Sequence, residues 1–421
     1  MLTLEQFYSG LADGSLARAH HIRLSDGLAE FPAALYQLVD TLEILDLSGN
    51  QLTTLPDELT RFKKLRILFA SNNPFTELPR VLGRMPQLEM VGFKACQIEH
   101  VPEDSLPPRL RWLILTDNRL QSLPDAMGHC PRLQKLMLSC NQLKALPASL
   151  VRCEKLELLR LASNQFESVP EQVFALPALA WLAIAGNAFT QKSELLAYKT
   201  YGLKPISYQN LQLYELLGEG ASGHIYRATD GQQSLALKVF KAAYTSDGTP
   251  QSELAAGLAA GQHPHLLTPL AAVTGAPDGQ LAMALPLLSA DMQPLAGPPS
   301  FDSCTRDVYA LQLRLTQTVA DRLLQGIRAA VQHLHQRGLL HGDLYAHNTL
   351  CNLQTGEAVL SDMGAAALLN DLPDTQKAQL QQMELRALRI LEAEIQALVA
   401  STLTAGKQAW HSPQTCCPPR P

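Results

Sequence analysis

Apolar residues in the first half of the chain recur at a fixed spacing. Between residues 42 and 189 one phrase repeats, L-x-x-L-x-L-x-x-N-x-L-x-x-L-P, with clear copies in LEILDLSGNQLTTLP and LQKLMLSCNQLKALP. Copies follow each other every 22 or 23 residues, and the Asn position falls at Asn50, Asn73, Cys96, Asn118, Asn141, Asn164 and Asn187. A unit this short cannot bury its own leucines, so neighbouring units must stack into a solenoid.

Each unit predicts a short strand followed by a turn. The leucines at its first, fourth and sixth places point inward, and the Asn amide bonds backbone groups where the coil turns. At Cys96 the thiol can fill the same slot weakly. An earlier, degenerate copy has Gly27 in this slot, and residues 1–32 are expected to cap the array. We therefore predict repeats over residues 33–190 and a capping helix with a linker over residues 191–207.

The positions between the inward leucines form the concave face, where polar side chains are the ordinary expectation. Several large apolar residues occupy them instead, which favours a docking surface for a protein partner. The alternative is that these side chains pack laterally along the strand ladder. The expected docking residues are Phe69, Met90, Trp112, Ile114 and Met137.

Beyond Asn187 the repeat ends and strand-like and helix-like patterns alternate. Residues 213–226 predict a strand, a turn with Gly218, Gly220 and Gly223, and a second strand. Glycines at this spacing let backbone approach a phosphate closely. A dinucleotide fold would need a helix next, whereas a β-run follows, which favours a loop folded over a nucleotide. The same criteria predict helices at residues 251–260 and 322–335 and strands at 235–240 and 281–288.

One lysine and one glutamate stand out among these apolar elements. Lys238 is the lone charge in its predicted strand, and Glu253 is the lone acid in the helix that follows. The functional interpretation is a cation on the α- and β-phosphates held by a carboxylate. The alternatives are a lysine on an edge strand and a solvated glutamate.

Side chains that could take part in catalysis or bind a metal are most concentrated in HGDLYAHN, residues 341–348. Asp343 and Asn348 are five residues apart, and Asp362 of the sequence SDMG follows Asn348 by fourteen. Two acids and an amide at this spacing suit a site that positions a hydroxyl and holds Mg²⁺ against a phosphate chain.

Taken in order, these motifs over residues 208–400 resemble a protein kinase domain, and the whole chain resembles the bacterial leucine-rich-repeat protein kinase family. The resemblance implies an α/β multidomain protein, a repeat solenoid followed by a bilobal α+β domain. It implies ATP and Mg²⁺ as cofactors and serine/threonine phosphorylation in signalling. Asp343 and Lys238 would be catalytic, and Asn348 and Asp362 would hold Mg²⁺. The nucleotide would contact Gly218, Gly220, Gly223, Ala236, Lys238, Glu253, Leu285, Leu287 and Leu350.

The chain departs from the kinase pattern around the same loop. Gly342 stands where regulated kinases have Arg, which predicts no cation in this loop to pair with a phosphorylated activation loop. Tyr345 replaces a Lys that lies near the transferred phosphoryl group. Only 21 residues separate Asp362 from Glu384, with no Ala-Pro-Glu among them. We therefore expect a truncated C-lobe whose central helix carries Glu384, followed by a tail at residues 401–421.

Composition limits the classes of protein to which the chain could belong. Apolar content of 46% and a net charge of −5 fit a folded protein and argue against a general nucleic-acid or acidic-membrane binder. The eight cysteines lack metal-type pairing, and the N-terminus lacks the apolar run of a signal peptide. Reduced thiols and a cytoplasmic location are expected.

Four functions are compatible with the sequence. The first is an ATP-dependent protein kinase whose repeats recruit a protein substrate. The second is a catalytically dead kinase fold that acts as a scaffold, and the third is a small-molecule phosphotransferase, since H-G-D-L with a downstream Asn also occurs in aminoglycoside and choline kinases. In the fourth, the repeats are the function and the second half is vestigial.

Overall fold

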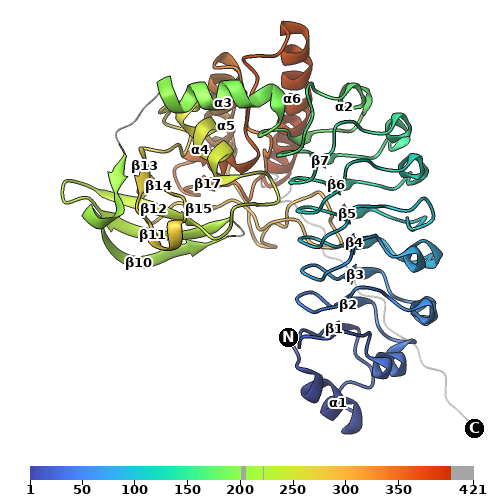
Figure 1. Ribbon diagram of the computed structural model, residues 1–421. Coiled ribbons are helices and arrows are strands. Elements are labelled where there is room, and N and C mark those ends of the chain that lie inside the picture. Colours follow the sequence, from blue (N-terminus) through green and yellow to red (C-terminus); the bar gives the residue numbers. More distant parts are fainter. Residues whose placement is uncertain (201–204, 221, 400–421) are drawn as a thin grey trace, which may run out of the picture.

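The computed structural model describes residues 1–200, 205–220 and 222–399. Part of the expected linker, residues 201–204, and the expected tail, residues 401–421, lie outside this range. The chain forms a curved repeat array and a second, two-lobed part that packs against that array, with contacts from β3 to β8 (Figure 1). In the described residues no helix combines the length and apolar character needed to cross a membrane.

The array is an eight-stranded parallel sheet in strict chain order from β1 to β8. Helix α1 (Leu4–Ala12) covers its N-terminal end, and α3 (Ala188–Thr200) follows its last strand. One turn of 3₁₀-helix closes most coils on the convex side, and α2 (Glu171–Ala175) does so after β7. The strands are β1 (His21–Arg23), β2 (Ile44–Asp46), β3 (Ile67–Phe69), β4 (Met90–Gly92), β5 (Trp112–Ile114), β6 (Lys135–Met137), β7 (Leu158–Arg160) and β8 (Trp181–Ala183).

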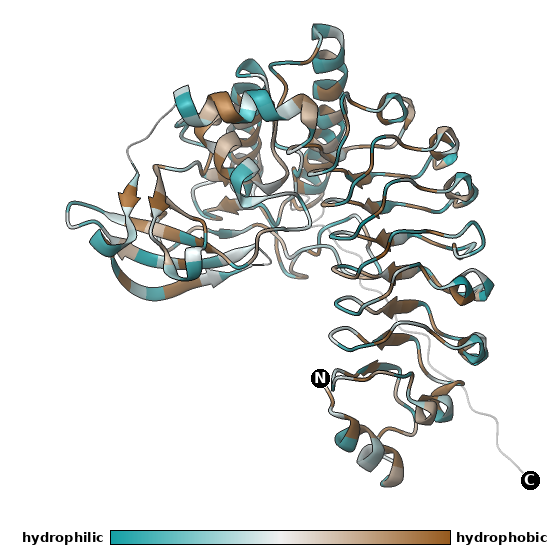
Figure 2. Ribbon diagram, in the orientation of Figure 1, coloured by the Kyte–Doolittle hydropathy of each residue, from teal (hydrophilic) through white to brown (hydrophobic). Residues whose placement is uncertain are grey.

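The predicted repeat logic explains this solenoid. The central residue of each strand points inward, and Leu68, Leu113 and Leu136 are fully buried. Figure 2 shows the resulting hydrophobic line along the stacked strands. At each turn the Asn amide joins adjacent coils: Asn141 Nδ2 donates to Leu115 O at 2.9 Å and Leu138 O at 3.0 Å, and its Oδ1 accepts from the Leu120 amide at 3.0 Å. Cys96 makes only long Sγ contacts, 3.5 Å to Ala70 O and 3.7 Å to Lys94 O.

The second part begins with a small mixed sheet in the order β10-β11-β12-β14-β13-β9. All neighbours are antiparallel except β13 and β9. Helix α4 (Pro250–Ala260) lies between this sheet and the rest of the domain. The strands are β9 (Ile206–Ser207), β10 (Gln212–Glu219), β11 (Gly223–Thr229), β12 (Ser234–Phe240), β13 (Ala271–Thr274) and β14 (Ala282–Pro286).

The other lobe is built on two long helices, α5 (Gln317–Gln336) and α6 (Asp374–Ala397). Both predicted helices of this region are therefore present, and α6 carries Glu384. Short strands flank the loop of interest. Between α5 and α6, β16 (Leu339–Leu340) pairs with β19 (Ala367–Leu368), and β17 (Thr349–Cys351) and β18 (Ala358–Leu360) form a three-stranded sheet with β15 (Gln293–Pro294), which precedes α5.

The two parts share a close interface on the concave side of the array. Met90 is fully buried in a cluster with Cys304, against which Phe69 and Trp112 also pack. The Phe69 ring centroid lies 5.6 Å from that of Phe301. The apolar surface expected to dock a separate partner is thus covered in part by residues 301–304 of the chain itself. Met137 packs against the core that includes the second part, and Ile114 is half-buried on β5.

Replacing Asn141 should destabilise the array far more than the same change at Cys96. In Asn141→Ala the backbone groups bonded by the amide lose a buried partner, which costs about 1–3 kcal/mol. Cys96→Ala, in the equivalent slot, loses only weak thiol contacts and serves as the control. Urea unfolding followed by circular dichroism measures both. Equal midpoints for the two variants would show that the Asn ladder does not stabilise this solenoid.

Candidate active site

Lys238 and Glu253 form a buried ion pair at the centre of the small sheet. Lys238 lies on β12 between β11 and β14, and Glu253 lies on the first turn of α4. Lys238 Nζ is 2.6 Å from Glu253 Oε1, and the two side chains are 8% and 3% exposed. The alternatives of an edge-strand lysine and a solvated glutamate are therefore wrong.

The start of α4 fixes the position of Glu253. Thr249 caps the helix by accepting from the Ser252 amide at 3.2 Å, and Pro250 supplies a first residue suited to a helix. Burial raises the pKa of Glu253 to about 7, against the opposing effect of Lys238. Burial also acts to lower the pKa of Lys238, but the carboxylates of Glu253 and Asp362 outweigh it and raise that pKa above its ordinary value.

The glycines of the β10–β11 turn divide into two kinds. At Gly223 an added Cβ would lie 2.5 Å from Val239 O, so the neighbouring strand itself requires glycine. At Gly218 and Gly220 an added Cβ would meet nothing within 4 Å. Protein packing therefore explains Gly223 but not the other two, which is compatible with their expected contact with phosphates.

Residues of α6 and Asp307 anchor the loop of residues 341–348 at its two ends. Glu384 Oε1 accepts from the Gly342 amide at 2.7 Å, and its Oε2 lies 2.7 Å from His335 Nε2. At the far end of the loop, Asp307 accepts from the His347 amide at 2.9 Å and contacts His347 Nδ1 at 2.7 Å. These bonds hold both ends of the loop against the core of the lobe.

Asp343, Asn348 and Asp362 are brought together as the sequence predicts. Asn348 Nδ2 donates to Asp343 Oδ2 at 2.8 Å, and the Ser361 amide donates to Asn348 O at 2.8 Å, which places Asp362 beside them. Asp362 has a left-handed backbone with φ of 59°, and its Oδ1 accepts from the Gly364 amide at 3.1 Å. Asp362 is exposed to solvent.

The oxygen donors of this cluster fit Mg²⁺. Because Asn348 Nδ2 is committed to Asp343, its Oδ1 remains as the ligand atom, and Asp362 offers a carboxylate. Over the described ranges no three or more His, Cys, Asp or Glu side chains gather to hold a metal ion by themselves. A bound phosphate would have to supply further oxygens, as is usual for Mg²⁺ at such sites.

Of the four apolar residues expected to contact the nucleotide, three cluster together. Ala236 on β12 and Leu285 on β14 are register partners in the sheet, and Leu287 packs against the same cluster. Leu350 lies on β17 in the other lobe, half-buried and outside this cluster.

Family models divide the chain in the same way as the fold. A protein kinase domain model matches residues 211–387, and leucine-rich repeat models match residues 41–62 and 108–166. The chain is a leucine-rich-repeat array fused to a protein kinase domain.

Individual relatives match one part at a time. The kinase domain is similar to cyclin-dependent kinase 11.1 of Caenorhabditis elegans, 28% identical over 39% of this chain and 22% of that protein. The repeats are similar to the human PH domain leucine-rich repeat-containing protein phosphatase 1, 30% identical over 22% of this chain and 5% of that protein. Among solved structures, a leucine-rich repeat protein of Leptospira interrogans is 27% identical over 39% of this chain and 48% of its own, with a TM-score of 0.33.

One charged residue of the kinase site comes from the repeat array and was missed by the sequence analysis. Arg160, at the end of β7, donates from Nη1 to Gly342 O at 3.1 Å and from Nη2 to Asp343 Oδ1. Its Nε lies 2.7 Å from Oδ1 of Asp247, in the loop before α4. The expectation that the loop itself offers no cation to a phosphorylated activation loop stays a prediction, since Arg160 lies outside the loop and pairs with Asp343 and Asp247.

These charges determine the ionisation of the loop. Burial acts to raise the pKa of Asp343, but the adjacent Arg160 guanidinium outweighs it and the pKa is lowered. At Asp247 burial prevails over the effect of Arg160, and the pKa of Asp247 is raised.

The only sequence signal that could have identified Arg160 was its position as a single arginine in an otherwise uncharged stretch of the concave row, between Met137 and Ala183.

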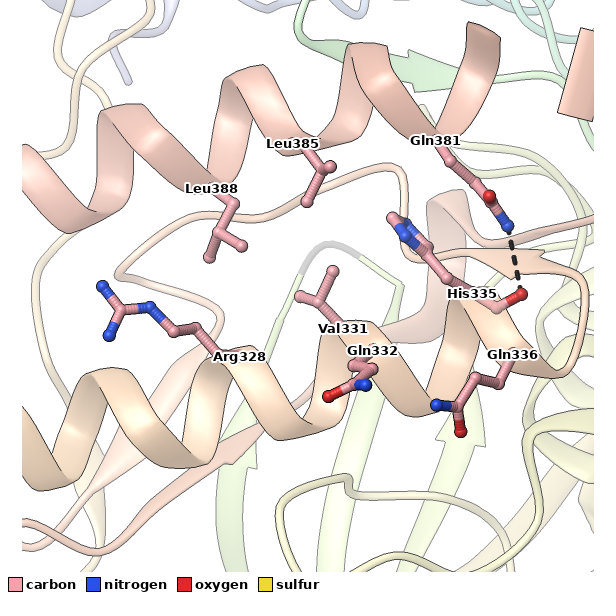
Figure 3. Close-up of a pocket in the computed structure, with 8 residues that line it drawn as sticks. All are labelled: Arg328, Val331, Gln332, His335, Gln336, Gln381, Leu385 and Leu388. Atoms are coloured by element: carbon pink, nitrogen blue, oxygen red, sulfur yellow. Dashed lines mark hydrogen bonds between the residues drawn. The ribbon is translucent and has the colours of Figure 1, made fainter. Parts of the chain in front are cut away.

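A pocket of about 520 Å³ lies away from these groups, between α5 and α6 (Figure 3). Val331 of α5 and Leu385 and Leu388 of α6 are its apolar lining residues, and Gln381 Nε2 donates to His335 O at 3.0 Å at one end. None of the expected catalytic, nucleotide or metal residues lines it. The kinase site is therefore defined by its charged cluster and not by this cavity.

Lys238→Met should weaken ATP binding or phosphoryl transfer. Methionine preserves the length of the side chain but removes the charge for the phosphates, and a charged hydrogen bond contributes about 1.5–3 kcal/mol, roughly a 10- to 100-fold effect. Titration calorimetry with Mg·ATP and a transfer assay measure the two quantities. The control is Lys144→Met, at an exposed position of the array. Wild-type values for both quantities in Lys238→Met would exclude Lys238 as a phosphate ligand.

Proposed function

We propose that this chain is an ATP-dependent protein kinase that transfers the γ-phosphoryl group to a serine or threonine hydroxyl of a protein. The arrangement that supports this most is the Lys238–Glu253 pair facing Asp362, with Asp343 and Asn348 next to it. A cation for phosphates, an acceptor for a hydroxyl proton and oxygen ligands for Mg²⁺ are the groups that phosphoryl transfer requires.

Each residue has a distinct task in this proposal. Lys238, held by Glu253, contacts the α- and β-phosphates. Asp343 orients the acceptor hydroxyl and accepts its proton, while Asn348 and Asp362 would hold Mg²⁺. The ion, when bound, neutralises charge on the phosphate oxygens. Because the protein residues are fixed by backbone bonds before any ligand arrives, they contribute mainly by positioning.

The position of the array favours a protein as acceptor. A hydroxyl that approaches Asp343 does so beside Arg160 of β7, and Trp181 of β8 covers the next residues of the loop. The concave residues that lie beyond this contact would therefore border the path of a bound substrate. This placement supports a role of the repeats in recruiting a protein substrate.

A scaffold function without catalysis is the second candidate, and one observation favours it. Arg160 already occupies Oδ1 of Asp343, and Asn348 occupies Oδ2. A protein that used the kinase fold only for binding would tolerate such pairing.

The change Asp343→Asn should abolish transfer and leave Mg·ATP binding nearly intact. Asparagine keeps the shape of the side chain but cannot accept the hydroxyl proton, and loss of such a group typically lowers the rate by roughly 10²–10⁴-fold. Autophosphorylation with labelled ATP and phosphorylation of casein measure transfer, and calorimetry measures binding.

The matched control is Asp125→Asn, an exposed aspartate on the convex side of the array. It should retain full transfer. Equal phosphorylation by wild type and Asp343→Asn would reject the catalytic assignment. Nucleotide binding without any transfer by the wild type, to itself or to casein, would favour the scaffold.

A further inference from the structure

Arg160 is a buried charge whose partners all lie in the other half of the chain. Its side chain is 3% exposed, and its three contacts go to Gly342, Asp343 and Asp247. Its ladder neighbours in the same row, Met137 and Ala183, bear no charge. A guanidinium withdrawn from water is tolerated only when it is paired. The kinase domain, and not the array, therefore provides the environment that Arg160 requires.

The guanidinium orients the Asp343 carboxylate without using all of its hydrogen-bond acceptor sites. An ionised carboxylate has about four lone-pair sites. Arg160 takes one on Oδ1 and Asn348 takes one on Oδ2, so both oxygens keep capacity for a hydroxyl donor. The Asp343 side chain also stays 15% exposed. This geometry orients the carboxylate and leaves it accessible.

Further residues of the catalytic loop are shaped to receive the array. Gly342 has φ of 76°, and a Cβ there would lie 2.6 Å from Leu182 O of β8 and 2.4 Å from Ala365 O. Trp181 Nε1 donates to Leu344 O at 2.9 Å, and its ring stacks on Tyr345 with centroids 4.4 Å apart. Four successive loop residues, 342 to 345, thus contact β7 or β8.

We propose that Arg160 is a positioning residue of the kinase site, supplied by the repeat array, and that phosphoryl transfer requires the array to be docked. The guanidinium holds the Asp343 carboxylate and the Gly342 carbonyl in the arrangement that receives the acceptor hydroxyl. This inference rests on the proposed kinase activity. It adds that the catalytic unit comprises both halves of the chain.

Steady-state kinetics of the full-length Arg160→Ala protein test the inference. We expect kcat to fall about 100-fold, as for a catalytic group displaced by about 1 Å, while KM for ATP changes little because Arg160 contacts none of the nucleotide residues. Arg160→Lys should recover only part of the rate, since an ammonium cannot reproduce the fork of a guanidinium. Added guanidinium ion, below its denaturing range, should raise the rate of Arg160→Ala but not of wild type.

Arg111→Ala is the matched control. Arg111 also lies on the array at this interface, where it donates to Asp302 O and pairs with Glu89, but it does not contact the catalytic loop. It should keep the wild-type kcat. A kcat for Arg160→Ala equal to wild type would overturn the inference, and a higher kcat would overturn it in favour of a contact that blocks the site.

Hydrogen exchange of the peptide spanning residues 341–348 provides a readout that does not depend on activity. It should be faster in Arg160→Ala and in Arg160→Lys than in wild type, and unchanged in Arg111→Ala. Unchanged exchange in both Arg160 variants would sink the inference. If the wild-type protein transfers no phosphate, the proposed kinase function itself fails. If wild type is active and Arg160→Ala has the same kcat, only the positioning role of Arg160 fails.

Discussion

The contact between Arg160 and two aspartates is the constraint on which the arrangement of the two halves depends. Moving a guanidinium and two carboxylates out of water is costly, and only close mutual pairing offsets that cost. Arg160 comes from β7, Asp343 from the loop of residues 341–348 and Asp247 from the loop before α4. Because these are three separate parts of the fold, any large rotation between the array and either kinase lobe would break at least one pair and leave a buried charge unmatched.

The same contact explains how a kinase domain with so short a segment after Asp362 keeps an ordered catalytic loop. Only η8 (Met363–Ala365) and β19 separate Asp362 from the start of α6. One side of the loop is held by Glu384 and Asp307 within the lobe. The other side is covered by β7 and β8, and Ala365 is buried in a small cluster with Ala162 and Ala183 of the array. The repeats thereby cover a surface that the short segment leaves open.

Sequence patterns predicted the parts of this protein that depend on local spacing. The repeat period identified the solenoid, and a lysine in a strand with a glutamate in the next helix identified the buried pair. Arg160 could not be found in this way, because its partner Gly342 lies 182 residues away and no pattern links the two. The concave apolar residues were recognised as a contact surface, but hydrophobicity does not specify a partner. Cys304 and Phe301 supply part of that partner from within the chain.

Gly342 shows most clearly how a local interpretation can miss a long-range constraint. In the sequence it reads as the loss of an arginine. In the structure, a Cβ at this position would collide with Leu182 O and Ala365 O, so any side chain would push β8 away from the loop. An arginine at position 342 would therefore not fit the contact that the loop makes with the array here. With glycine at 342 the array can approach, and its own Arg160 then places a guanidinium on the carbonyl of that same glycine and on Asp343. A guanidinium thus contacts this loop from the repeats and not from position 342.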